Sequence, residues 1–266
     1  MRVFGAQIEI EGESVTANRR RAEQAIEVGV EKGADLIVLP ELWNVGFFAA
    51  DAYQTVAEPL DGPTLSRIAA LAERHGVWIL AGSVVEDLAA TAASTPADDG
   101  LANTSVLFGP NGRRQANYRK QHLFGYESAE RDRLTPGETL GTATVGEFTV
   151  GIATCYDLRF PELFRTYVDA GVDLFLVPSA WPYPRIEHWE TLTSARALEN
   201  LAFVVAVNGA GAAGGPGLVG RSRVVDPWGT TVRAVGPDPA TFTVAIESER
   251  VDSVRDSFPA LDDRRP

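Results

Sequence analysis

Cysteine is almost absent from this sequence, because Cys155 is the only one among its 266 residues. A single thiol excludes an internal disulfide framework and fits a reducing compartment. No apolar run is long enough to cross a bilayer, and the first residues read directly as a strand rather than as a signal peptide. We therefore expect a cytoplasmic protein with no membrane partner.

Lysine is nearly as scarce, since only Lys32 and Lys120 occur among 24 basic residues, against 36 acidic ones. The formal net charge of -12 disfavours a nucleic-acid partner, because such affinity rests largely on Lys and Arg that neutralise phosphates. The acidic, lysine-poor composition has two explanations. Either a GC-rich genome encodes basic residues mainly as arginine, or the protein is adapted to high salt, and both explanations stay open.

Strand-like and helix-like segments alternate along the chain, which predicts an α/β protein. We expect strands near residues 2–10, 35–39, 77–83, 104–109, 113–118, 148–154, 173–178, 203–207, 219–225, 231–235 and 241–247. We expect helices near residues 16–32, 63–75, 160–170 and 187–201. Each half of the chain gives strand–helix units followed by a hairpin, which predicts two mixed sheets with helices outside them, packed as a four-layer αββα sandwich. Because no linker separates the halves, residues 1–266 are predicted to form a single domain.

Cys155 lies where a predicted strand gives way to a helix. The apolar run 148–154 ends at Cys155, and Pro161 then begins a helix, the position that proline tolerates best. A thiol at such an elbow points outward, and the backbone N–H groups that follow are free to hold an oxyanion. The placement suggests a nucleophile, although a small buried core residue is the ordinary alternative.

Two other residues with reactive side chains come directly after strands. Glu41 follows Pro40 at the end of a buried strand, where a surface glutamate is the alternative. Lys120 is retained in a chain that otherwise uses arginine, which indicates a need for a compact point charge unless it survives by chance. Glu41 can take the thiol proton of Cys155. Lys120 would lower the pKa of that thiol and, with the Tyr156 N–H, stabilise an oxyanion.

Three segments resemble, in the family's order, the signature of the nitrilase superfamily of carbon–nitrogen hydrolases. They are Pro40-Glu41-Leu42, Tyr118-Arg-Lys-Gln-His-Leu123 and Cys155-Tyr-Asp-Leu-Arg-Phe-Pro-Glu162. The resemblance covers essentially the whole chain. It implies an αββα fold, an acyl-thioester mechanism, no cofactor, no metal and a homodimer.

The resemblance also assigns catalytic roles. It implies Cys155 as the nucleophile, Glu41 as the base and Lys120 as the third member of the triad. A second glutamate is implied a few residues ahead of a Pro-Gly turn, where Glu130 fits and Glu127 is a nearby alternative. Its expected role is to hold Lys120 or the substrate.

Later stretches resemble the aliphatic amidase-like branch that includes ω-amidases, namely 178–182, 185–189 and 195–200. This branch implies hydrolysis of a small non-peptide amide to ammonia and a carboxylate. An N-carbamoyl amine or amino acid amidohydrolase, a deaminated glutathione amidase and a nitrilase stay open as alternatives on the same fold. A non-catalytic binding protein of this fold is a remote alternative, and a papain-like protease lacks a local signature for its histidine partner.

Several side chains are candidates for contact with the substrate. We expect Tyr156, Trp181, Phe48 and Asn44 in the pocket. Arg185 is a candidate for holding a substrate carboxylate, with an ordinary surface arginine as the alternative.

Other features are expected to play supporting roles or none. Arg159 is expected to pair with Asp157 or Glu162. The segment 209–214 matches a dinucleotide fingerprint, but Gly215-Pro-Gly217 follows where a helix is required. The histidines, His75, His122 and His188, lack metal-ligand spacing. The sequence 220–222 reads Gly-Arg-Ser where the family often has Gly-His-Ser. The loop 88–100 reads as an insertion that either shapes pocket access or is merely floppy.

Overall fold

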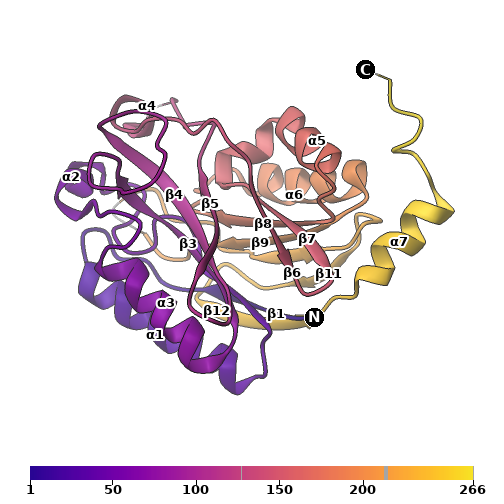
Figure 1. The fold of residues 1–266 in the computed structure, drawn as a ribbon, viewed down its shortest axis with the longest axis horizontal. Coiled ribbons are helices and arrows are strands. Elements are labelled where there is room, and N and C mark those ends of the chain that lie inside the picture. The colour runs from indigo at the N-terminus through magenta and orange to yellow at the C-terminus, as the bar shows by residue number, and fades with distance from the viewer. Residues whose placement is uncertain (127, 213–214, 266) are drawn as a thin grey trace.

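The computed structural model describes residues 1–126, 128–212 and 215–265. It shows two six-stranded mixed sheets that pack against each other, with helices on their outer faces (Figure 1). The predicted α/β class and the αββα arrangement are therefore confirmed. None of the described helices is both long and apolar enough to pass through a membrane.

The first sheet has the strand order β12-β1-β2-β3-β4-β5. Its strands are β1 (Arg2–Gln7), β2 (Leu36–Val38), β3 (Trp78–Asp87), β4 (Leu101–Phe108), β5 (Arg114–Arg119) and β12 (Ala240–Ala245). Strands β1, β2 and β3 are parallel, whereas β4, β5 and β12 join in antiparallel fashion. Helices α1 (Val15–Glu31) and α3 (Pro63–His75) cover its outer face.

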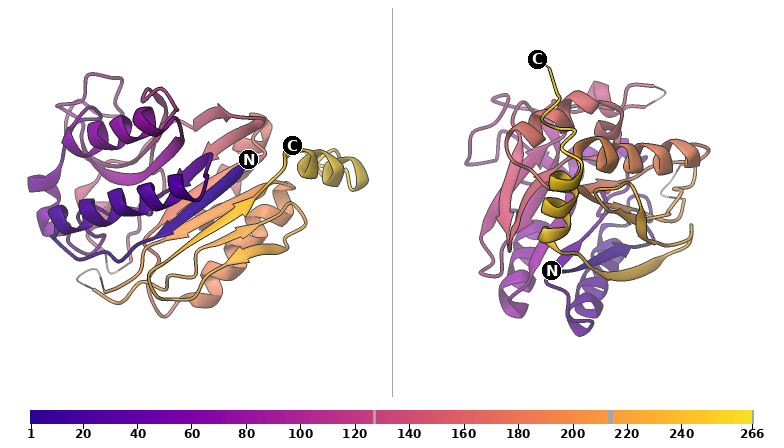
Figure 2. Two further views of the ribbon diagram at one scale, coloured as in Figure 1. Left: turned by 90° about the horizontal axis from the view of Figure 1, so that it is seen from below. Right: turned by 90° about the vertical axis from the view of Figure 1, so that its right-hand side faces the viewer.

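The second sheet has the order β11-β10-β9-β8-β7-β6. Its strands are β6 (Gly141–Val145), β7 (Phe148–Ile152), β8 (Leu174–Ser179), β9 (Phe203–Asn208), β10 (Arg223–Val225) and β11 (Thr231–Ala234). Strands β7, β8 and β9 are parallel. Helices α5 (Pro161–Asp169) and α6 (Ile186–Asn200) lie on the face away from the first sheet, and Figure 2 shows the resulting layers from two sides.

The alternation of side chains along each strand builds two cores. In β2, Leu36 and Val38 face the second sheet and join the core between the sheets, whereas Ile37 joins the core beneath α1 and α3. All three side chains are fully buried. Burial of each such side chain contributes about 1.5–3 kcal/mol, so the packing of both layers fixes the register of the strand.

One strand and one of the longer helices were not predicted. Strand β6 has exposed positions in an edge strand of small residues, and helix α7 (Ser248–Ser257) buries only Val251 and Val254, so neither has a strong apolar pattern. Strand β10 is shorter than the predicted 219–225, because Gly220 and Arg221 both have positive φ. The shorter elements are η1 (Ala50–Ala52), α2 (Tyr53–Val56), α4 (Glu130–Arg133) and η2 (Cys155–Arg159).

Candidate active site

Strands from both sheets deliver side chains to a common site. Glu41 follows β2 and Lys120 follows β5 in the first sheet, whereas Cys155 follows β7 and Ala180 follows β8 in the second. Glu41 Oε2 accepts a hydrogen bond from the Ala180 N–H at 2.8 Å, which links the two sheets directly. The three residues predicted from the strand ends are thus brought together.

The turn that carries Glu41 is held against β3. Gly82 has a φ of +61°, and a Cβ there would lie 1.9 Å from the Pro40 carbonyl oxygen, so only glycine allows this approach. The Ser83 N–H donates to that carbonyl at 3.2 Å, and Ser83 Oγ accepts from the Leu42 N–H at 3.0 Å. These contacts fix the direction of the carboxylate that comes between Pro40 and Leu42.

Cys155 occupies a strained position at the start of η2. Its φ of +47° lies in the left-handed region, which costs a non-glycine residue about 1–3 kcal/mol. A capping box between Thr154 and Asp157 holds the turn, with the Thr154 N–H donating to Asp157 Oδ2 at 2.8 Å. Tyr118 Oη also donates to Asp157 Oδ2, at 2.8 Å, and the His122 N–H donates to Oδ1 at 3.1 Å. The elbow is therefore fastened from the first sheet as well.

Lys120 sits between two carboxylates in the interior. Its Nζ donates to Glu41 Oε1 at 2.8 Å and to both Glu130 oxygens at 2.9 Å. All three side chains are buried. The Phe124 N–H donates to Glu130 Oε2 at 2.8 Å. The predicted role of Glu130 in holding Lys120 agrees with these contacts, while the alternative, Glu127, lies outside the described residues.

Asn103, on β4, is part of the same network and was not predicted. Its Nδ2 donates to Glu41 Oε1 at 2.8 Å and to Glu130 Oε1 at 3.0 Å, and its side chain is fully buried. The run Asn103-Thr104-Ser105, three polar residues inside an apolar strand, is the sequence pattern that could have pointed to it.

The pKa of Cys155 differs from the sequence-based expectation. Burial, followed by the negative charge of Glu41, raises the pKa of the Cys155 thiol well above its usual value, and Lys120 acts in the opposite direction. Lys120 lowers the pKa of the thiol as expected, but the expected thiolate is wrong, because burial and the charge of Glu41 outweigh the effect of Lys120. The resting sulfur is a thiol, and it becomes a nucleophile only when a base takes its proton.

The charges of Glu41, Glu130 and Lys120 also affect one another's surroundings, which is seen in the pKa of Lys120 and of Glu130. Burial acts to lower the pKa of Lys120, but the negative charges of Glu130 and Glu41 raise it well above its usual value. Lys120 therefore stays protonated. Burial raises the pKa of Glu130, while Lys120 and a hydrogen bond from Asn103 act in the opposite direction.

A small cavity opens beside the sulfur. It has a volume of about 20 Å³, room for little more than one water molecule. Its lining comprises Phe47, Lys120, Phe124, Cys155, Tyr156, Arg159, Ala180, Trp181, Pro182 and Arg185. The predicted pocket residues Tyr156, Trp181 and Arg185 are among them.

Two predicted pocket residues do not line this cavity. Phe48 packs edge-on against Phe47 with ring centroids 5.2 Å apart, and Phe47 is the one that reaches the cavity. Asn44 is buried near α1, where its carbonyl accepts from Asn18 Nδ2 at 3.2 Å. Gly46, with a φ of +90°, lies between these two residues, where the chain forms turns rather than a helix or strand.

Arg159 lines the cavity instead of supporting the elbow. Its Nη2 lies 2.9 Å from His188 Nδ1, and its guanidinium lies over the Trp181 ring at 5.1 Å. It pairs with neither Asp157 nor Glu162, because Asp157 is occupied by the donors that hold the elbow.

Arg185 lies on the same cavity, with its guanidinium 5.7 Å from the centroid of the Phe124 ring. Within the described part of the chain, neither Arg185 nor Arg159 forms an ion pair with an acidic side chain. The cavity therefore has two guanidinium groups that no acidic side chain of residues 1–126, 128–212 and 215–265 neutralises.

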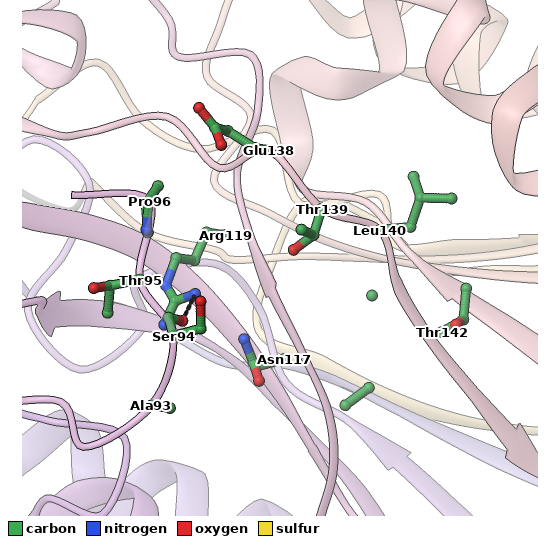
Figure 3. Close-up of a pocket in the computed structure, with 12 residues that line it drawn as sticks. Ala93, Ser94, Thr95, Pro96, Asn117, Arg119, Glu138, Thr139, Leu140 and Thr142 are labelled. Atoms are coloured by element: carbon green, nitrogen blue, oxygen red, sulfur yellow. Dashed lines mark hydrogen bonds between the residues drawn. The ribbon is translucent and has the colours of Figure 1, made fainter.

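A second cleft, of about 440 Å³, lies between β5, β6 and part of the loop 88–100 (Figure 3). Residues 93–96 line it, and none of the loop lines the Cys155 cavity. Arg119 points into this cleft but is bound by Glu86 at 2.7 and 2.8 Å and donates to the Ser94 carbonyl at 3.1 Å. Its charge is therefore neutralised within the protein.

The remaining sequence features have separate surroundings. His75 on α3 contacts Glu27, whereas the His122 ring stacks on Phe160. In residues 1–126, 128–212 and 215–265, no group of three His, Cys, Asp or Glu residues could hold a metal ion. The glycine-rich segment 209–214 is described only to residue 212, and residues 215–222 form no helix. Arg221 contacts Glu190 at 3.3 Å.

The fold and the arrangement of the site define a hydrolase of non-peptide carbon–nitrogen bonds. The carbon-nitrogen hydrolase family model matches residues 3–256, and the chain belongs to this family. The resemblance to the nitrilase superfamily is confirmed.

Two relatives and one solved structure show which enzymes the chain is similar to. The chain is 37% identical to a 2-oxoglutaramate amidase of Paenarthrobacter nicotinovorans, over 99% of this chain and 89% of that protein. It is 31% identical to a deaminated glutathione amidase of Synechocystis sp., over 94% and 93%. A crystal structure of a CN-hydrolase superfamily protein from Xanthomonas campestris, with an arsenic adduct in its active site, superimposes with a TM-score of 0.89 at 31% identity, covering 100% of this chain and 97% of that one.

Proposed function

We propose that this enzyme releases ammonia from the terminal amide of a short acyl compound that carries a carboxylate, such as 2-oxoglutaramate. The observation that supports it is the cavity at Cys155, where Arg159 and Arg185 have no acidic partner among the described residues. A guanidinium group matches a carboxylate in geometry and charge. The similarity to a 2-oxoglutaramate amidase supports the same substrate class.

The catalytic steps follow from the positions of the three central residues. Glu41 accepts the thiol proton, and the Cys155 sulfur attacks the amide carbon to form a tetrahedral intermediate. Lys120 and the Tyr156 N–H stabilise the oxyanion. The protonated Glu41 then gives its proton to the departing ammonia as the carbon–nitrogen bond breaks. The acyl group stays on Cys155 as a thioester. Glu41 then activates the water that hydrolyses the thioester and returns the free thiol.

The remaining site residues support this reaction. Glu130 holds Lys120 in place through both carboxylate oxygens. The rings of Tyr156 and Trp181 form walls of the cavity beside the sulfur, where the acyl chain of the substrate would lie. No cofactor takes part in the proposed steps.

The test is ammonia release by the wild type and by Cys155→Ala over a panel of substrates. The panel contains 2-oxoglutaramate, 2-oxosuccinamate, propionamide, an N-carbamoyl amino acid, a nitrile and deaminated glutathione, for which the released amine is measured instead. We expect turnover of the two ω-amides by the wild type alone. Intact-mass analysis during turnover should show an acyl adduct on Cys155. Activity retained by Cys155→Ala would contradict the mechanism, and preference for another panel member would assign a different substrate.

We also propose a single catalytic domain over residues 1–266 that acts as a homodimer in the cytoplasm. Exposed apolar side chains of Leu198 on α6, Trp228 and Phe258 support a subunit contact, with the Trp228 and Phe258 rings 5.6 Å apart. The nucleophilic thiol must stay reduced, which supports a reducing compartment. The net charge supports the absence of a nucleic-acid partner. Sedimentation of the wild type and Trp228→Lys tests the dimer, and a wild type that sediments as a monomer contradicts it.

A further inference from the structure

Asn103 and Lys120 close a ring with the two buried glutamates. Each donates one hydrogen bond to Glu41 Oε1 and one to Glu130 Oε1, at 2.8–3.0 Å. The Asn103 carbonyl also accepts from the Lys120 N–H at 2.9 Å. One residue thus contacts the backbone of the lysine and the side chains of both acids.

We infer that Asn103 is a positioning residue for the hydrolysis, which holds the Glu41 carboxylate in place and aimed at Cys155. The inference rests on the proposed role of Glu41 as the base. With Oε1 bound by Asn103 and Lys120, Oε2 remains on the side of Ala180 and the second sheet, where the thiol lies. The side chain of Asn103 is not among those that line the cavity, so it acts through Glu41 and not on the substrate.

The chemistry of an amide explains why this residue type stands here. Two carboxylates and one ammonium leave an excess negative charge in a buried site, and neighbouring carboxylates disfavour each other's ionisation. An amide N–H stabilises both acids and adds no charge. Its hydrogen bond to Glu130 acts against the rise in the pKa of Glu130 that burial causes.

Within the described residues, the buried amide oxygen of Asn103 makes no hydrogen bond, as is also true of Asn200, so the functional reason rests on the two acids that the Asn103 donors reach. A buried unpaired oxygen is unfavourable, so packing alone would prefer an apolar side chain at this position. The amide is kept for its donors.

Several titratable groups surround the Glu41 carboxylate. They are Lys120, Glu130 and Cys155, with Tyr53 of α2 farther away, whose pKa is raised well above its usual value by burial and by the charges of Glu130 and Glu41. Lys120 stays protonated and Cys155 stays a thiol at neutral pH. The acid limb of kcat/KM therefore reports the loss of negative charge from this group of residues as a whole.

The experiment compares the pH profiles of kcat/KM for 2-oxoglutaramate in the wild type, Asn103→Ala, Asn103→Asp and the control Asn200→Ala. Asn200 is likewise a fully buried asparagine, but on α6, where its Nδ2 bonds to the Arg196 carbonyl. For Asn103→Ala we expect kcat to fall about 10- to 100-fold with KM nearly constant. The acid limb should move to higher pH, because the site loses a hydrogen-bond donor that acts to lower the pKa of Glu130.

Asn103→Asp gives the opposite dependence on pH. Its new carboxyl repels the two acids when ionised and donates a hydrogen bond when protonated, so its activity relative to the wild type should rise toward low pH. Asn103→Ala should lose relative activity toward low pH. A merely structural defect, as expected in Asn200→Ala, scales the profile without moving the limb, and this result for the Asn103 variants overturns the inference.

Two further measurements keep the outcomes separate. If Asn103→Ala does not fold, as judged by circular dichroism, the isosteric Asn103→Asp decides alone. If the wild type fails to turn over any amide, the proposed function fails. The inference is then tested by the pH dependence of Cys155 alkylation with iodoacetamide, which must differ between the wild type and Asn103→Asp.

Discussion

Lys120 Nζ lies 2.8 Å from Glu41 Oε1, and both side chains are completely buried. This ion pair joins the ends of β5 and β2, which lie 79 positions apart in the chain. Because a second carboxylate, Glu130, shares the same ammonium group, loss of the cation would leave two acids together without compensation. Lys120 therefore affects stability as well as chemistry.

Substitution of Lys120 should lower both activity and stability, in contrast to substitution of Lys32, the other lysine of the chain. Lys120→Arg replaces a compact ammonium by a larger fork in a buried site, and we expect kcat/KM to fall roughly 10²- to 10³-fold. Lys120→Ala should lower the free energy of unfolding by about 3–5 kcal/mol. Lys32→Arg, at the end of α1, should leave both quantities unchanged. Urea unfolding and ammonia release measure the two effects, and wild-type activity in Lys120→Arg would refute the need for a point charge.

Glu41→Gln should lower the pKa of the Cys155 thiol and, at the same time, remove the base that catalysis needs. After burial, the charge of Glu41 is the main cause that raises the pKa of the thiol, so its removal should lower that pKa. We expect ammonia release to fall about 10²- to 10⁴-fold. The midpoint of iodoacetamide alkylation against pH should move to lower pH. Glu162→Gln, an exposed residue of α5, is the control, and a midpoint that rises or stays in Glu41→Gln contradicts the assignment.

Arg159→Ala and Arg185→Ala should impair binding of charged substrates only. A hydrogen bond between charged groups contributes about 1.5–3 kcal/mol, so KM for 2-oxoglutaramate should rise about 10- to 100-fold in each variant. Propionamide has no carboxylate, and its kcat/KM should stay within about threefold, because the removed charge has no partner in it. Arg114→Ala, an exposed residue at the start of β5, is the matched control. Equal losses for both substrates would assign the arginines to the shape of the cavity.

Asp173 should make stability depend on pH in an unusual direction. Burial raises its pKa from 3.8 to about 6, so the folded state holds this proton more tightly than the unfolded state. Its contribution to stability is therefore present below pH 4 and is lost as the pH rises through about 6. Asp173→Asn can keep the hydrogen bond from the Thr149 N–H. It should raise Tm at pH 8 and have little effect at pH 4, and a loss of stability at pH 8 would argue against this sign.

The sequence identified the residues that follow strands but not those within them. Glu41, Lys120 and Cys155 stand at strand ends, where chemistry is expected, whereas Asn103 lies inside β4 and acquires its meaning only from two acids distant in sequence. Phe48 was expected in the pocket, but its neighbour Phe47 lines the cavity, because the segment around Gly46 belongs to no helix or strand whose side-chain directions a sequence pattern predicts.

The sequence predicted the positions of the catalytic side chains better than it predicted the pKa of Cys155 or the partner of Arg159. The pKa of Cys155 depends on how deeply the sulfur is buried and on whether Lys120 is already paired, and both are three-dimensional facts. Arg159 was placed with nearby acids because the sequence shows neighbours along the chain, whereas its contact with His188 joins η2 to α6.

Glu41, Asn103 and Lys120 belong to one sheet, and Cys155 and Trp181 belong to the other. Moreover, β12 comes from the end of the chain and pairs with β1 at its beginning, so the first half of the sequence does not contain its complete sheet, whereas all strands of the second sheet lie in the second half. Catalytic turnover therefore requires that the two sheets have packed against each other. A chain cut between β5 and β6 would yield two inert fragments, and ammonia release would appear only when they reassociate, which makes this fold a built-in reporter of fragment complementation.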